Sequence, residues 1–478
     1  MENINKNNTA TNFQEEINNN SPEVTIANKD INNHSQLSNQ VLIQVQNELK
    51  QNLFPINRKI RYYIYLMELL CLFNYDQGAI SASTKEIKIF FKMNDRELGS
   101  FGGISFLGTT LGGIFSLSII NKINRKYIIL SLMLISIFSL YFPTIISSKL
   151  FFMFCRILTG FSQSFMSIYL PVWVDQFGIY KKKSIMISII SIPSAFGYLF
   201  GNILVVYTSW RTTFKINTLM CTGLFIGFFL NKNLYFSKSI MPIKKSSNNN
   251  INNLDAISMF EDVTINHRQN FDNQSMIKIG LKCFESKLFR YITIAIISIF
   301  FILSGFQFWI NDFFENALNI KDKKNRLIYF IIIITFTALF APITGGLIMQ
   351  KLGGYDSRKV IYLPFCCCIV SLFCCNLMIL SNNKYYISIL LELYLFSGCM
   401  IIPSLNGILI TSLSKEYAGS VSAISNLLYN ICGRLVGPYF YGVTRSFLDI
   451  NSTLPMIILF NVKIITAFCL WKSFKYKK

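Results

Sequence analysis

Five of the charged side chains inside long apolar runs are the residues best suited to chemistry: Glu68, Asp76, Arg156, Glu392 and Arg434. Placing such a side chain at the centre of a bilayer costs roughly 2.5–3.5 kcal/mol on translocon scales, so it generally faces a protein interior or a wet cavity. There, a guanidinium group can bind an anion, and a carboxyl group can bind a cation or a proton. These residues are therefore candidates for substrate binding and coupling, against the alternative of purely structural ion pairs.

The depth of two of these residues predicts that they meet. Asp76 lies nine residues before Lys85, and Arg156 lies seven residues after Lys149. A helix rises 1.5 Å per residue, so both side chains lie about 10–14 Å from the same end of their helices. We expect Asp76 and Arg156 to face each other within the first half of the chain.

The same argument pairs two charges of the second half. Glu392 lies eight residues after Lys384, and Arg434 lies eleven residues before Arg445. We therefore expect Glu392 and Arg434 to form a second ion pair. Glu68 lies nearer the other end of its run, where a long side chain can extend to water.

The sequence offers no enzyme site. The histidines, His34 and His267, lie outside the apolar runs, and all twelve cysteines except Cys283 lie inside them among apolar neighbours. A metal site needs polar ligands at defined spacing and a supporting second shell, which these cysteines do not match. There is also no phosphate-binding glycine loop with a lysine and no Ser–His pairing. We predict no catalytic residues, no metal and no cofactor.

Long apolar runs dominate the chain. Of its 478 residues, 52% are hydrophobic and only 14% are charged, whereas soluble proteins carry about 25% charged residues. Crossing about 30 Å of hydrocarbon takes about 20 helical residues. Twelve runs qualify, at 62–81, 101–120, 127–146, 150–172, 184–206, 214–230, 288–309, 327–349, 360–380, 385–412, 421–441 and 454–471. The predicted fold is an all-α membrane protein with twelve transmembrane helices in two six-helix bundles.

Polar segments divide the chain into five parts. The first has fourteen Asn between Asn3 and Asn52, and such a composition predicts disorder. The parts are an Asn-rich tail at 1–60, a first bundle at 61–230, a polar linker at 231–287, a second bundle at 288–471 and a basic tail at 472–478.

The net charge of +21 indicates membrane topology. Nucleic-acid binding is disfavoured, because the cations lie in short runs between apolar segments and form no single basic face. Lys and Arg concentrate in cytoplasmic loops, and their distribution predicts that both termini and the linker are cytoplasmic. We expect a multi-pass monomer of the plasma membrane or of a lysosome-like or vacuole-like organelle.

An offset of 236 residues relates the two halves. It maps Gly197 and Gly201 onto Gly433 and Gly437, and glycine lets helix backbones approach closely in lipid. Parallel repeats of this kind place a substrate site at the interface of the halves, near mid-membrane. The glycines serve either static packing or the sliding of helices in a carrier, and the sequence leaves both readings open.

The residues after the second and eighth runs resemble the major facilitator superfamily signature, roughly GxxxDRxGR. Asn121 and Gln350 stand where the signature has its acid, while the cation Arg125 persists. Within the superfamily, the chain resembles the spinster-like branch and its protist relatives. The matching pieces include Asn74-Tyr75-Asp76, Arg156-Ile-Leu-Thr-Gly160, Ile192-Pro193-Ser-Ala-Phe-Gly197 and Asn426-Leu-Leu-Tyr-Asn430.

This resemblance implies export of lysophospholipids or sphingoid lipids, often linked to protons, with Asp76 and Arg156 at the polar centre of the cavity. Gln77 stands where the branch has a basic residue, and Gln163 stands where it has an acid. An amide does not titrate, so half of the branch's proton-coupling pair is missing. Passive transport and coupling through Glu392 both stay open.

The predicted function is therefore a transporter that moves a small organic solute by alternating access, with a lysolipid or sphingoid lipid favoured and protons as a coupling partner. One alternative is a sugar, amino-acid or drug carrier of the same superfamily. Another is a non-transporting membrane receptor or scaffold on the same fold. A channel is disfavoured, because the sequence has no filter segment. The expected partners are the solute and membrane lipids, with no nucleic acid.

Overall fold

The computed structural model describes residues 56–119, 123–177, 186, 189–230, 282–352, 357–413, 418–448 and 452–477. The chain divides into two compact units. The larger comprises Tyr65–Val172 and Ile187–Lys478, and the smaller comprises Met1–Ile64 and Trp173–Met186. Within the smaller unit, the Trp173 ring stacks on Tyr62 and Tyr63, with centroids 6.2 and 6.1 Å away.

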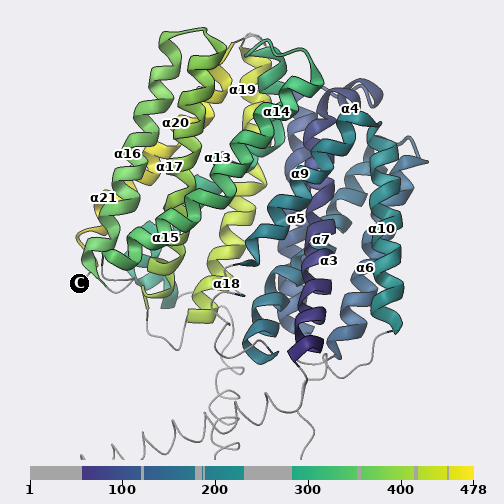
Figure 1. The fold of residues 1–478 in the computed structure, drawn as a ribbon. Helices are drawn as coiled ribbons and strands as arrows, with labels where there is room; N and C mark the ends of the chain where they lie inside the picture. Colours follow the sequence, from purple (N-terminus) through teal and green to yellow (C-terminus); the bar gives the residue numbers. More distant parts are fainter. Residues whose placement is uncertain are drawn as a thin grey trace, which may run out of the picture. The chain divides into compact units, whose positions relative to one another are not determined.

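Long helices make up the first half of the chain (Figure 1, purple to teal). A short helix, α4 (Thr84–Phe90), follows the first of them. The long helices are α3 (Ile56–Ala82), α5 (Asp95–Ile119), α6 (Arg125–Tyr141), α7 (Lys149–Phe177), α9 (Ser191–Tyr207) and α10 (Trp210–Leu230).

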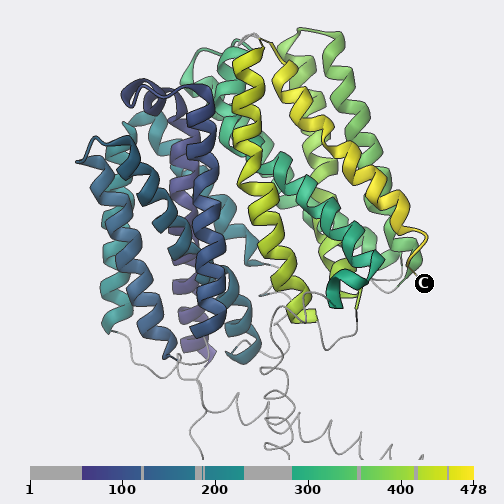
Figure 2. The ribbon, with the colours of Figure 1, turned by 180° about the vertical axis from the view of Figure 1, so that it is seen from behind.

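The second half is built in the same way but contains two π-helical segments, η4 (Thr335–Phe340) and η8 (Tyr429–Arg434). η4 lies between α14 and α15, and η8 lies between α18 and α19, which Figure 2 shows from behind in yellow-green. The α-helices are α13 (Lys287–Asn316), α14 (Lys323–Ile334), α15 (Ala341–Lys351), α16 (Tyr362–Leu377), α17 (Lys384–Ile410), α18 (Ala418–Leu428), α19 (Val436–Phe447), α20 (Leu454–Asn461) and α21 (Lys463–Ser473).

Each of the twelve predicted runs overlaps one helix or a stack of helical segments, so the predicted all-α membrane fold is confirmed. The run 184–206 does so only in part, because α9 begins at Ser191. Nine helices in the described ranges are long and apolar enough to cross a membrane. Helix α3 is described from Ile56 onward, and the predicted start of the first bundle at 61 falls within it. Residues 1–55 and 231–281, which hold the predicted tail and most of the linker, lie outside the described residues.

Short polar side chains start several of these helices. Asn124 accepts a hydrogen bond from the backbone N–H of Lys126 at the start of α6, over 3.1 Å. Asn383 does the same for Tyr385 at the start of α17, over 2.9 Å. Such caps satisfy backbone donors that have no partner within the helix, and so fix where the membrane-crossing segments begin.

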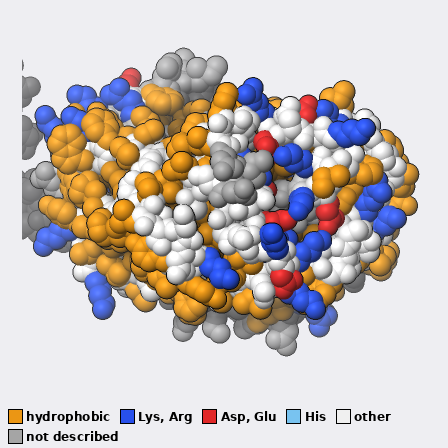
Figure 3. Space-filling model, turned by 90° about the horizontal axis from the view of Figure 1, so that it is seen from above, with side chains coloured by type: hydrophobic (Ala, Val, Ile, Leu, Met, Phe, Trp, Pro, Cys, Tyr) orange, Lys and Arg blue, Asp and Glu red, His pale blue; other side chains and the backbone are white. Residues whose placement is uncertain are grey.

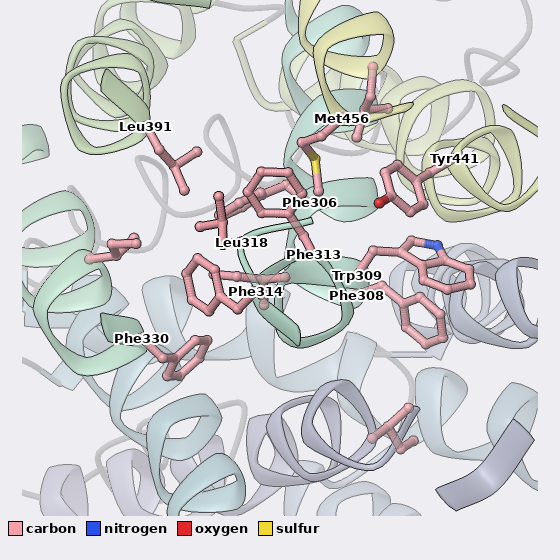
Figure 4. Close-up of a cluster of buried hydrophobic side chains, with 14 of the residues drawn as sticks. Phe306, Phe308, Trp309, Phe313, Phe314, Leu318, Phe330, Leu391, Tyr441 and Met456 are labelled. Carbon is pink, nitrogen blue, oxygen red and sulfur yellow. The ribbon is translucent and has the colours of Figure 1, made fainter. Parts of the chain in front are cut away.

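A cluster of aromatic side chains forms the core around the end of α13 (Figure 4). Phe306, Trp309 and Phe313 are at most 4% exposed, and the Trp309 indole N–H donates to the carbonyl oxygen of Pro438 over 2.9 Å. The cluster continues into the first half through residues such as Phe101. Burying large rings from both halves in one cluster stabilises their contact.

Candidate functional site

Asp76 of α3 and Arg156 of α7 form a buried ion pair, and their side chains are only 1% and 3% exposed. Arg156 Nη1 donates to Oδ2 of Asp76, and Gln163 Nε2 donates to Oδ1 over 2.8 Å. The second guanidinium nitrogen, Nη2, donates to Oε1 of Gln77 over 3.3 Å. The meeting of Asp76 and Arg156 expected from their depth is confirmed, and both carboxylate oxygens have partners.

This network lies beside the surface on which the two halves meet. The Arg156 guanidinium lies 5.8 Å from the ring centroid of Phe101 in α5. The next residue, Gly102, lies so close to α13 that an added Cβ would stand 2.6 Å from the Phe308 ring. The two amides of the network are half-buried, unlike the charges. A solute arriving here would meet amide groups, which are backed by a mutually neutralised ion pair.

The expected pair of Glu392 and Arg434 is not found among the described residues, and that prediction was wrong. Neither carboxyl oxygen of Glu392 has a hydrogen-bond partner there. The Arg434 guanidinium lies instead over the rings of Phe300, Tyr429 and Phe106, at 4.4, 5.2 and 5.6 Å from their centroids. Two side chains at the same depth along their helices need not point toward each other. Arg434 ends the π-helical segment η8 and points toward α13 and α5, whereas Glu392 lies on α17.

The aromatic surroundings of Arg434 come from both halves of the chain. Phe106 belongs to α5, whereas Phe300 belongs to α13. A cation over an aromatic face gains about 0.5–2 kcal/mol, and it keeps its N–H donors free to bind an anion. π-Helical turns are frequently found at functional sites. Arg434 is therefore placed to bind an anionic group at the interface of the two halves.

Sequence reasoning missed a buried lysine in the second half. Lys463, which begins α21, is 2% exposed, and its Nζ lies 3.9 Å from the centroid of the Tyr394 ring. Gly398 leaves room for this amine, because an added Cβ would lie 2.7 Å from Nζ. The signal was available, since Lys463 is a charge within the apolar run 454–471.

Ion pairs join the halves at the end of the larger unit where α3 ends and α5 begins, which we call the contact end (top of Figure 1). Asp95 Oδ1 lies 2.6 Å from Lys88 Nζ and 3.9 Å from Arg445 Nη1 of α19. Arg445 also pairs with Asp312 of α13. Two more exposed pairs cross between the halves, Lys85–Glu315 at 2.5 Å and Lys323–Glu86 at 2.9 Å. Figure 3, seen from above, shows acidic and basic side chains interspersed over part of this face.

Hydrogen bonds and close backbone contacts reinforce the contact end. Asn311 Nδ2 donates to Asn202 Oδ1 of α9 over 2.9 Å and to Ser81 Oγ over 3.2 Å. A Cβ added at Gly103 of α5 would lie 2.1 Å from the carbonyl oxygen of Leu435. The two halves are therefore held shut here by polar groups and by a glycine contact.

The four glycines of the internal repeat all lie at close helix contacts. An added Cβ would lie 2.0 Å from a carbonyl oxygen at Gly197, 2.1 Å at Gly201, 2.8 Å at Gly433 and 2.1 Å at Gly437. The first two glycines pack α9 on α3, and the other two pack η8 and α19 on α13. The repeat therefore places equivalent tight contacts in the two halves.

The remaining predicted site residues lie apart from the buried network. Glu68 is exposed on α3, and Gln350 is exposed on α15. Arg125 is buried at the start of α6, with its guanidinium 5.7 Å from the ring centroid of Tyr169. Asn121 lies outside the described residues.

The sequence profile of the Major Facilitator Superfamily matches residues 68–438. The chain belongs to this superfamily. A comparison with curated proteins gives no match. Because the superfamily is one of solute transporters, the predicted class of membrane transporter, and not of enzyme, is confirmed.

Solved structures of this superfamily share the fold. A bacterial homologue of the human lysosomal transporter Spinster, inward-facing and unoccupied, gives a TM-score of 0.73 at 12% identity, over 89% of this chain and 98% of that one. The xylose transporter XylE from E. coli, in an inward-open state, gives 0.63 at 13% identity, over 88% and 96%. The nucleoside transporter NupG gives 0.57 at 14% identity, over 86% and 99%. At these identities, the likeness shows the shared fold.

Proposed function

We propose that this transporter carries a small organic solute by alternating access of its two halves. The closed contact end supports the proposal, because Asp95, Arg445 and Asp312 link helices of both halves there. Ion pairs and helix contacts at glycines can separate without unfolding either half. Exchange with a state that is closed at the opposite end would then expose a central site to each side in turn.

The substrate is an amphipathic lipid with an ionic headgroup, such as a lysolipid or a phosphorylated sphingoid lipid. The support is Arg434, a cation that lies among aromatic rings and has no acidic partner within 4.0 Å in the described residues. Phe300, one of those rings, also lines a small cavity whose other lining residues are Ile296, Ile299, Ile402, Leu405 and Asn406. A headgroup at Arg434 would place its chain beside these apolar side chains.

The contact end faces away from the cytoplasm, and both termini lie in the cytoplasm. Basic side chains support this orientation, because Arg125, Lys126, Lys351, Lys359 and Lys472 lie at the helix ends opposite the contact end. Cations concentrate on the cytoplasmic side of membrane proteins, whereas the contact end mixes both signs of charge. The membrane is the plasma membrane or that of a lysosome-like or vacuole-like organelle, and the working form is a monomer.

Flux of labelled lysophosphatidylcholine through purified protein in liposomes tests the substrate. We expect the wild type to move this probe, and we expect Arg434→Ala to slow its movement. An exposed arginine of α13, Arg290, provides the matched control Arg290→Ala, which should leave flux unchanged. Labelled xylose and a labelled nucleoside are tested in the same assay, because a xylose transporter and a nucleoside transporter share this fold.

Each outcome separates the candidates. Flux of xylose or the nucleoside without flux of the lysolipid would show that the substrate is a polar solute and not a lipid. Absence of flux for all three probes would favour the alternative of a receptor or scaffold on the same fold.

A further inference from the structure

We infer that Glu392 of α17 is the proton-binding group of this transporter, an inference that rests on the proposed alternating-access function. Both carboxyl oxygens of Glu392 are buried and have no hydrogen-bond partner among the described residues. No lysine or arginine nitrogen of those residues lies within 4.0 Å of them. An ionised carboxylate without a cation or a donor is costly in an apolar environment, so the neutral, protonated acid fits this site.

Glu392 lies on a side of α17 that is only partly buried. Glu392, Cys399 and Asn406 recur every seven residues, which is close to two helical turns, so they share one side of α17. Asn406, on that side, lines the small cavity with Ile296 and Phe300 of α13. Glu392 therefore lies on the side of α17 that continues toward the cavity beside Arg434.

In the described part of the first half, the buried carboxyl group of Asp76 is not comparable to that of Glu392. Both oxygens of Asp76 already accept hydrogen bonds, one from Arg156 and one from Gln163. Gln163 is an amide and does not titrate. Glu392 is instead an acid whose oxygens have no hydrogen-bond partner among the described residues, so a proton is the ligand that fits them best.

Other titratable groups near α17 do not occupy this site. η4 and α18, which pack on α17, contain no acidic or basic residue. Lys463 lies over Tyr394, about half a turn around α17 from Glu392. Besides Glu392, the charged or titratable groups of α17 itself are Lys384, Tyr385, Tyr386, Tyr394 and Cys399. The other neighbouring segments contribute Tyr362 and the cysteines Cys366, Cys367, Cys368, Cys374 and Cys375 of α16, Lys351 of α15, Arg358 and Lys359 of η5 (Arg358–Ile361), and Lys287, Arg290, Tyr291, Asp312 and Glu315 of α13.

The proton cycle follows from the two states. In the state closed at the contact end, the buried acid holds its proton. When the halves exchange, water reaches the carboxyl group on the other side, and the proton is released to that water. The halves then return with the carboxyl group ionised, and it takes up a new proton from water on the first side, so one proton crosses for each cycle.

Infrared spectroscopy of the purified full-length protein tests the site without a substrate. We expect the carbonyl band of a buried protonated carboxyl group in the wild type, its loss in Glu392→Gln, and its retention in Glu285→Gln, which removes an exposed glutamate of the same half. An unchanged band in Glu392→Gln would overturn the inference. So would a wild-type spectrum without the band.

Flux in liposomes that contain a pH-sensitive dye tests coupling. With labelled lysophosphatidylcholine as the probe, we expect the wild type to move protons with lipid, and Glu392→Gln to move lipid without protons. Proton movement that persists in Glu392→Gln would overturn the inference while leaving the transport function intact. If the wild type moves no lysolipid, the proposed substrate fails, and the infrared result decides the proton site independently.

Discussion

Gln163 donates a 2.8 Å hydrogen bond to the Asp76 oxygen that Arg156 leaves free. An acid at position 163 would need a proton to make this contact, whereas the amide makes it at any pH. The buried network of the first half is therefore closed and charge-neutral without a proton. This relationship agrees with the inference that Glu392 of the second half, and not this network, binds the proton.

Removal of Arg156 should destabilise the protein strongly. Arg156→Ala leaves the buried Asp76 carboxylate without its cation, and breaking a buried pair typically costs about 3–5 kcal/mol. Thermal unfolding in detergent measures the loss. The control Arg290→Ala removes an exposed arginine and should change stability by less than about 0.5 kcal/mol. Equal stability of the two variants would show that the pair contributes little.

Gln163→Glu should make stability depend on pH. The new carboxyl group would lie beside the Asp76 carboxylate, and two like charges at hydrogen-bond distance resist joint ionisation. A proton shared between them relieves this repulsion, so the stability of the variant should be highest in acid and should fall as pH rises. Unfolding midpoints across pH measure the effect against the wild type. A variant whose pH profile matches that of the wild type would contradict the geometry.

The α3–α9 contact should not tolerate a methyl group. Gly201→Ala would place a Cβ 2.1 Å from the Tyr75 carbonyl oxygen, which forces the helices apart and costs about 1–3 kcal/mol. Gly113 of α5 supplies the matched control, because an added Cβ there meets nothing within 4 Å. We expect lower thermal stability for Gly201→Ala and unchanged or higher stability for Gly113→Ala. A lower stability for Gly113→Ala than for Gly201→Ala would contradict the close contact at Gly201.

The contact end should open when Arg445 loses its charge. Arg445 is 6% exposed and bridges Asp95 and Asp312, whereas Lys323 is half exposed in its pair with Glu86, and exposed pairs contribute only about 0–1 kcal/mol. Hydrogen–deuterium exchange should therefore rise in α4 and α19 for Arg445→Gln. It should stay near the wild-type level for Lys323→Gln. Equal hydrogen–deuterium exchange in the two variants would show that Arg445 does not hold the contact end closed.

Apolar run length was enough to predict the helices, and depth along the helix was enough to predict the Asp76–Arg156 pair. Depth failed for Glu392 and Arg434, because the direction of a side chain depends on the turn that carries it. The π-helical segment η8 sets the direction of Arg434, and local sequence does not reveal such a turn.

The ion pairs of the contact end were also beyond the sequence. The partners of the pairs that cross between the halves are more than 200 residues apart, as in Lys85–Glu315, and only the packing of the two halves brings them together. The sequence shows Arg445 as a cation beyond the end of its apolar run, but it does not show that Arg445 pairs with Asp312.

Locking the contact end is the most direct test of alternating access. Arg96 Nε of α5 donates to Ser446 Oγ of α19 over 3.2 Å, so Arg96→Cys with Ser446→Cys allows the halves to be joined through a thiol crosslink. Labelled lysophosphatidylcholine, xylose or a nucleoside serves as the probe, whichever the wild type carries, and Arg96→Cys alone is the control. Crosslinking of the double variant should abolish flux, and reduction should restore it. Undiminished flux through the crosslinked protein would contradict the account.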